Sequence, residues 1–224
     1  KNEVLYKTIK NTNPAYVSKI IEKDFASLPA PQLIDLLSSY LITNKTKLYT
    51  GSKLYEHLWN ICIYEIENLS LVHICSLLSI FKRSRFQDEA LYLSCAKEIL
   101  KRDDEMTSRA RANVLIALAY PVKKTGALLF YFDFAEKNLS KYLEAKDLKV
   151  IDFTGIFKGL SQGQVLRPES LSLIEDKCID LIDNGKEEGS IHIFADSFFA
   201  NRKIYKAERF WERFQKKVID EQEK

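Results

Sequence analysis

The feature that most constrains the fold is a short apolar signature that recurs about every 40 residues. Five copies align on Leu37, Leu78, Ile116, Ile156 and Ser197, which gives spacings of 41, 38, 40 and 41 residues. A second amphipathic segment follows each copy, so both halves of the unit recur together. Such a period is typical of helical-repeat proteins, in which each unit is one helix-turn-helix pair.

One helix pair cannot bury its apolar face alone, so neighbouring pairs must stack. The sequence therefore predicts an all-α chain: an α-solenoid of about five helix-turn-helix repeats within a single domain, 1–224. A flanking helix in 1–27 is expected to precede the first unit, and a longer connection at 42–52 is expected to project from the edge. The predicted units are 28–68, 69–106, 107–146, 147–186 and 187–224.

Composition supports a helical fold. Seven glycines and five prolines in 224 residues are too few for the turns of a β-sandwich or barrel, or for the glycine-rich loops of nucleotide-binding α/β folds. Helix boundary signals agree with the units. We expect Ser70, Thr107 and Asp147 to be N-caps, Pro168 to open a helix and Gly185 to follow the end of one.

No motif for catalysis or metal binding is present: there is no HExxH, no GxxxxGK and no GxSxG. We therefore expect no enzymatic activity, no cofactor and no metal. No apolar run approaches the roughly 20 residues that span a bilayer, and no signal-peptide pattern is found. The cysteines form no CxxC pair and share helical spacing with apolar residues, so we interpret them as core residues in a reducing compartment. They are Cys62, Cys75, Cys95 and Cys178.

Aromatic runs suggest some exposed rings. The aromatic residues of the run 130–134 cannot all face one side of a helix, so at least one is expected to meet solvent or a partner. Phe198 and Phe199 raise the same question. Phe210 and Trp211 make the last helix apolar for a free end, so we expect a partner or a further segment to cover it.

Charge is informative through its distribution. The chain has 34 Lys and Arg against 31 Asp and Glu, and this net charge of +3 by itself implies neither nucleic acid nor membrane. Turns joining first to second helices are rich in basic residues, whereas turns between units are mainly acidic. In a solenoid, turns of one kind lie along one edge, which predicts a basic edge and an acidic one. The basic turn residues are Lys45, Lys47, Lys82, Arg83, Arg85, Lys123, Lys124, Lys158, Arg167, Arg202, Lys203 and Lys206.

A row of cations at repeat spacing suits a nucleic-acid backbone, because each contacted phosphate releases counterions and the contacts sum. Single-stranded RNA fits best, since a curved helical surface can cradle a strand and stack its bases. The alternatives are that the cations complement the C-terminal ends of helices or meet acidic protein. The candidate RNA-binding residues are Lys45, Lys47, Lys82, Arg83, Arg85, Lys123, Lys124, Arg202 and Lys203.

The segments 69–83 and 86–91, with Leu77-Leu78-Ser79-Ile80-Phe81 at their centre, resemble organellar heptatricopeptide and octotricopeptide repeats. They are also similar to the repeat region of RAP-domain and FAST-kinase-domain proteins. The fourth and fifth units depart from the pattern at Gly155, Gly159 and Asp196, and armadillo or HEAT repeats are an alternative.

The resemblance implies a solenoid in the mitochondrial matrix or a plastid that acts on organellar RNA. The expected function is a non-enzymatic subunit of an organellar ribonucleoprotein, in particular the mitochondrial ribosome, with RNA and other protein subunits as partners. No homo-oligomer is indicated. The alternative is a protein-binding scaffold of a large mitochondrial complex that makes no RNA contact.

Overall fold

The computed structural model describes residues 27–44, 53–86, 88–187 and 189–222. All regular structure in these ranges is helical, and they contain no strand, which confirms the all-α prediction. The chain forms two compact units, Lys1–Glu105 and Met106–Lys224, which we describe separately. The expected flanking helix in 1–27 and most of the connection 42–52 lie outside the described residues.

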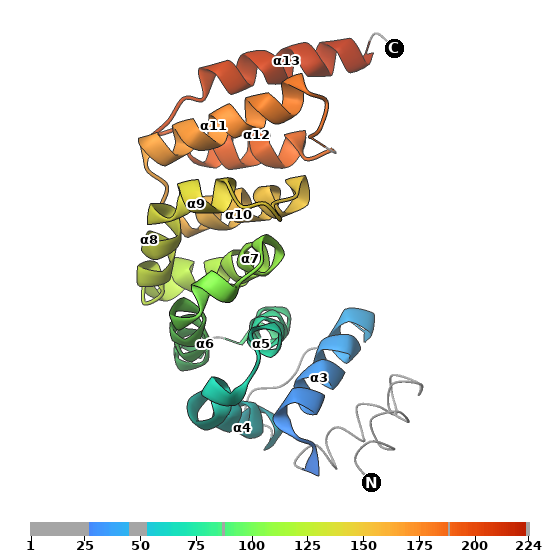
Figure 1. The fold of residues 1–224 in the computed structure, drawn as a ribbon, viewed down its shortest axis with the longest axis vertical. Coiled ribbons are helices and arrows are strands. Elements are labelled where there is room, and N and C mark those ends of the chain that lie inside the picture. The colour runs from blue at the N-terminus through green and yellow to red at the C-terminus, as the bar shows by residue number, and fades with distance from the viewer. Residues whose placement is uncertain (1–26, 45–52, 87, 188, 223–224) are drawn as a thin grey trace. The chain divides into compact units, whose positions relative to one another are not determined.

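The described part of the first unit contains two helix pairs. A π-helical turn, Ile61–Glu65, and a 3-10 turn, Ile66–Asn68, extend the second helix of the first pair. Helix α3 packs against α5, and α5 packs against α6 (Figure 1). The helices are α3 (Ala30–Asn44), α4 (Lys53–Asn60), α5 (Leu71–Ser84) and α6 (Glu89–Lys101).

The described part of the second unit also consists of packed helices. Helix α10 packs against both α7 and α12, and α11 packs against α13 (Figure 1). Within the aromatic run 130–134, Phe130 is exposed while Tyr131 and Phe132 are buried, as the helical geometry requires. The helices are α7 (Ser108–Thr125), α8 (Leu129–Lys137), α9 (Leu139–Leu143), α10 (Val150–Gly163), α11 (Pro168–Asp183), α12 (Ile191–Ala200) and α13 (Glu208–Gln222).

The close packing of α7 on α10 explains two glycines that depart from the repeat pattern. A Cβ atom built on Gly155 would lie 2.8 Å from the Cβ atom of Ala112. A Cβ atom on Gly159 would lie 2.6 Å from the Cβ atom of Leu115. These distances are too short for any side chain, so the glycines allow the two helices to approach closely.

Most helix boundary signals are confirmed. Ser70 accepts a hydrogen bond from the His73 N–H group, and Pro168 lies at the start of α11. The prediction for Asp147 is wrong, because α10 begins at Val150 after the N-cap residue Lys149.

The Asp147 carboxylate instead accepts two hydrogen bonds from Ser108 at the start of α7. One comes from the backbone N–H group and one from the hydroxyl group, both over 2.8 Å. These bonds lower the pKa of Asp147 below its usual range, because they favour the charged carboxylate. The Asp147 side chain therefore bonds to Ser108, 39 residues earlier in the chain, instead of capping the start of α10.

The first helices of three pairs end in the same backbone conformation. Residues Arg85, Gly126 and Gln164 follow α5, α7 and α10, and their φ angles are 57°, 67° and 60°. This left-handed conformation is a common way to end a helix and normally favours glycine. The turn geometry thus recurs while the residue type changes.

Buried glutamates connect successive pairs in the second unit. On α8, Glu136 accepts a hydrogen bond of 2.6 Å from the Ser170 hydroxyl group of α11. On α11, Glu175 accepts a bond of 2.9 Å from the N–H group of Phe210, in the first turn of α13. Each carboxylate therefore lies near the positive N-terminal end of the next second helix, where a negative charge is favoured.

The cysteines lie mostly in the interior. The side chains of Cys62, Cys95 and Cys178 are buried, which confirms their interpretation as core residues. Cys75 is partly exposed, and its partial burial raises the pKa of the thiol to about 11. A thiol with such a pKa is a poor nucleophile at neutral pH, because almost none of it is thiolate.

Candidate nucleic-acid interface

In the first unit, the turn after α5 brings three predicted RNA-binding residues together. Lys82 and Arg83 belong to the last turn of α5, and Arg85 is its C-cap. The side chains of Arg83 and Arg85 are exposed, and that of Lys82 is half-buried. The neighbouring Phe86 is buried, and its N–H group donates a hydrogen bond of 3.0 Å to the Phe81 carbonyl oxygen. The turn is therefore anchored beneath its charged surface.

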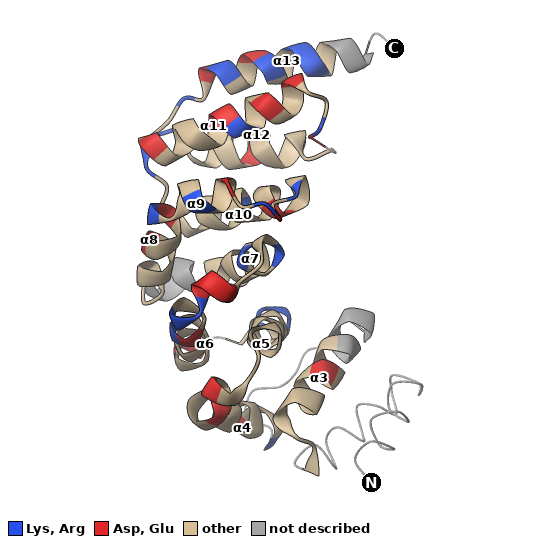
Figure 2. Cartoon of the chain, viewed as in Figure 1, with Lys and Arg blue, Asp and Glu red and all other residues tan. Residues whose placement is uncertain are grey.

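In the second unit, the turn between α12 and α13 carries Arg202 and Lys203, both exposed. Figure 2 shows basic residues in blue on the connection that leads into α13. Lys206, also exposed, lies at the end of the same turn. The two turns occupy the same position within a helix pair, between its first and second helices.

The other candidate residues are only partly placed. Lys45 and Lys47 lie outside the described residues. Lys123 and Lys124 belong to the last turn of α7, but their side chains are not among those described. Arg167, which the sequence analysis placed on the basic edge, is used within the fold. Its guanidinium group lies 3.2 Å from the Asp133 carboxylate and 3.7 Å from that of Glu136.

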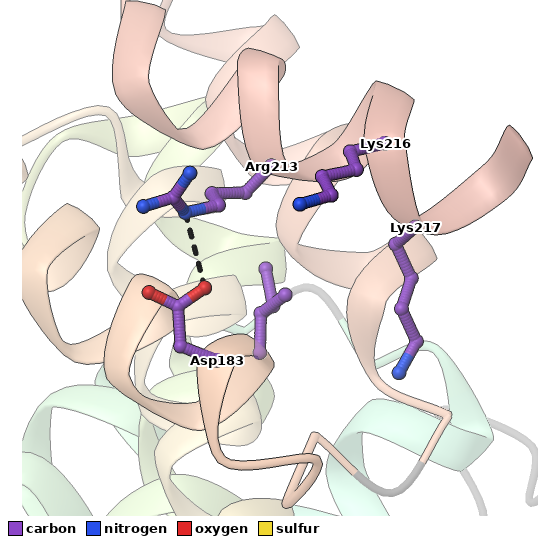
Figure 3. Close-up of a pocket in the computed structure, with 5 residues that line it drawn as sticks. Asp183, Arg213, Lys216 and Lys217 are labelled. Carbon is purple, nitrogen blue, oxygen red and sulfur yellow. Dashed lines mark ion pairs between the residues drawn. The ribbon is translucent and has the colours of Figure 1, made fainter. Parts of the chain in front are cut away.

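A polar groove of about 440 Å³ lies between the C-terminal end of α11 and α13. Figure 3 shows Arg213 and Asp183 pointing toward each other across it, with Nε of Arg213 3.0 Å from the carboxylate oxygen. Lys217 points away from this pair and binds the Glu187 carboxylate over 2.5 Å. Burial acts to raise the pKa of Glu187, but hydrogen bonds from Lys217 and the backbone outweigh it and lower the pKa.

These ion pairs identify the groove as part of the contact between α11 and α13. Arg209, Arg213 and Lys217 are spaced four residues apart, so they lie on one face of α13. Like Arg213 and Lys217, Arg209 pairs with a carboxylate: its guanidinium group lies 2.8 Å from the Asp176 carboxylate of α11. Sequence reasoning missed this set, although the four-residue spacing of the cations was its signal. These cations therefore belong to the contact between the two helices, and the exposed residues of the first-to-second turns stay the candidates for an external anion.

In the part of the chain that the structure describes, no group of three or more His, Cys, Asp or Glu residues is arranged to hold a metal ion. Among the same residues, no helix combines the length and apolar character needed to cross a bilayer.

Comparisons of the chain with protein families, with characterised proteins and with solved structures find no match. The functional argument therefore rests on the chain's own residues.

Proposed function

We propose that this chain is a non-enzymatic helical-repeat subunit of an organellar ribonucleoprotein, in particular the mitochondrial ribosome, and that it contacts RNA through its basic turns. The observation that carries the proposal is the exposed pair of cations at the same turn of a helix pair in each unit. These are Arg83 and Arg85 after α5, and Arg202 and Lys203 after α12. Exposed cations on such turns suit the phosphates of an RNA backbone.

The pattern of contacts supports the α-solenoid within this proposal. Hydrogen bonds between side chains of neighbouring pairs join residues 30 to 40 positions apart, such as Tyr205 with Glu175 and Asn201 with Ser161. A stack in which each repeat contacts its neighbours has this pattern. The organellar assignment rests on the resemblance of segment 69–83 to organellar repeats and on the buried thiols, which suit a reducing compartment.

Arg85 combines an exposed side chain with an uncommon backbone conformation. An arginine occupies a left-handed position at which glycine would be more stable. The predicted role of its exposed side chain is a phosphate contact.

The test is the salt dependence of binding to a labelled single-stranded RNA. Replacing Lys82, Arg83 and Arg85 together by Ala should leave helicity intact, because charges at exposed turns contribute little to stability. The slope of log affinity against log salt should flatten by up to about 2, at roughly 0.7 per lost phosphate contact.

A matched control is the replacement of Lys146 and Lys149, both exposed in the connection between α9 and α10, by Ala. This variant should keep the parent slope. If the triple variant also keeps the parent affinity and slope, the RNA-binding proposal is wrong.

Exposed apolar residues of the first unit favour a second candidate, a protein-binding scaffold without RNA contact. Tyr64 is 74% exposed, and Val72 and Ile63 are exposed as well. Such residues suit contacts with other subunits. This candidate predicts that Tyr64→Ala weakens incorporation into the native complex, whereas the triple basic variant incorporates normally.

A further inference from the structure

We propose that the turn between α12 and α13 holds one base of a single-stranded RNA on a stack formed by Phe199 and Arg202. This inference rests on the proposed function and assigns a base contact where sequence analysis predicted only charge. It concerns residues of the second unit alone.

The stack is formed by an exposed ring and a guanidinium group. Phe199 is 57% exposed at the end of α12, although the adjacent Phe198 is buried. The guanidinium carbon of Arg202 lies 3.9 Å from the centroid of the Phe199 ring. Arg202 also donates a hydrogen bond of 2.9 Å to the carbonyl oxygen of Phe199, which fixes the guanidinium group beside the ring. Nucleobases stack on aromatic rings and on arginine planes, so this pair offers a surface for a base.

Hydrogen bonds to neighbouring helices hold the turn on both sides of the stack. The amide group of Asn201 donates bonds of 2.8 Å to the Ser161 hydroxyl group and to the Ser197 carbonyl oxygen. On the other side, the Tyr205 hydroxyl group donates a bond of 2.6 Å to Glu175. The exposed side chains therefore project from a fixed backbone, and less conformational entropy is lost when a ligand binds.

The surroundings of the stack match a phosphate backbone. Segment 197–207 contains Arg202, Lys203 and Lys206, all exposed, and no Asp or Glu residue. Asp196 and Glu208 flank the segment on either side. Cations beside an exposed ring are the combination that single-stranded nucleic acids use, because phosphates pair with the charges while a base stacks.

A membrane surface is the competing ligand, since Ile204 is also exposed, by 52%. The position of Arg202 argues against it. Inserting the Phe199 ring into the acyl region would carry along the guanidinium group that lies against it, at a large desolvation cost. Stacking of a base requires no such step.

The test measures the affinity of the full chain for labelled oligo(A) RNA over a salt series. Phe199→Ala should lower the affinity about tenfold and leave the salt slope unchanged, because a stacking contact is lost and no charge is removed. Phe199→Trp should retain the parent affinity. Arg202→Lys should lower the affinity at an unchanged slope, because the charge remains and the planar group is lost.

The matched control is Tyr64→Ala, which removes an exposed ring next to Glu65 rather than next to cations. It should bind RNA as the parent does. If the parent binds RNA and Phe199→Ala binds equally well, the stacking proposal is overturned and the proposed function survives. If the parent shows no affinity for RNA at any salt concentration, the proposed function fails and this inference fails with it. Loss of binding to phosphatidylserine vesicles by Phe199→Ala, with RNA affinity unchanged, would identify the turn as a membrane contact instead.

Discussion

Arg85 and Gln164 adopt a conformation that most side chains disfavour. Both have φ angles near 60° and follow the first helix of a pair, where Gly126 occupies the matching place after α7. The left-handed conformation costs an L-residue roughly 1–2 kcal/mol. A comparison of the two positions can therefore separate the effect of the backbone strain on stability from the effect of the Arg85 charge on RNA binding.

We predict that Arg85→Gly raises the free energy of unfolding by about 1 kcal/mol, because the backbone strain is relieved. The same variant should flatten the salt dependence of RNA binding by roughly 0.7 for the lost phosphate contact. Urea unfolding and RNA titration measure the two effects. Gln164→Gly is the control, since it should gain similar stability with RNA binding unchanged. Unaltered salt dependence in Arg85→Gly would show that Arg85 contacts no phosphate.

A buried residue could be predicted from the sequence only where an apolar side chain also fell on the apolar face of a helix. The cysteines were found because they fall on apolar stripes. Glu136 and Glu175 were missed because a carboxylate is normally assigned to solvent. Their signal was position: Glu175 lies four residues after Leu171 and three before Cys178, on the apolar face of α11. A carboxylate on such a face implies a polar partner from another helix.

At the scale of the helix, Glu175 serves as the acceptor for the start of α13. It accepts hydrogen bonds from the Phe210 N–H group, the Tyr205 hydroxyl group and the Arg209 guanidinium group, at 2.9, 2.6 and 2.9 Å. The Phe210 N–H group is one of those that a helix start leaves without a partner inside the helix. The preceding pair, through Glu175, thus supplies a hydrogen-bond acceptor for the N-terminal end of α13.

Glu175→Ala should lower the free energy of unfolding by about 2–3 kcal/mol, because the buried Phe210 N–H group and the Tyr205 hydroxyl group lose their acceptor. Asp176→Ala is the matched control on the same helix. It removes only an exposed contact with Arg209 and should cost less than about 1 kcal/mol. Urea unfolding of both variants checks the difference, and equal losses would show that burial of Glu175 contributes nothing.

The sequence predicts helices well where their determinants are local. The capping by Ser70 and the start at Pro168 were visible in neighbouring residues. Two other features depend on residues far along the chain. Asp147 binds Ser108, and Gly159 makes room for Leu115, so neither role could be found without knowing which helices pack together.

At the scale of the whole molecule, contacts between pairs are local in sequence. The bonds that join Cys62 with Ser94, Glu67 with Lys101 and Glu136 with Ser170 span 32 to 34 residues. Bonds of this span are what a stack of repeats requires, and such a stack is what the 40-residue period predicts. The division into units at residues 105 and 106 had no signal in the sequence, since no Gly- or Pro-rich linker marks it.

We predict that destabilising changes in the two units are additive. Glu98 pairs with Lys101 and Arg102 in the first unit, whereas Glu175 pairs with Tyr205 and Arg209 in the second, so they share none of these partners. The double variant Glu98→Ala with Glu175→Ala should show a coupling free energy below about 0.5 kcal/mol in a urea double-mutant cycle. A coupling of several times this value would reveal a direct connection between the units.

The buried glutamates also bear on how such a chain can change its length. The pair formed by α10 and α11 receives the Glu136 carboxylate at Ser170 and supplies Glu175 to the start of α13. A duplicated pair would bring one such acceptor and one set of donors, so Glu136 and both copies of Glu175 would still meet a partner. A single inserted helix would leave one buried carboxylate without its donors. If the proposed stack of repeats is correct, we expect that duplication or engineering can lengthen this protein only in steps of a whole pair, about 40 residues each.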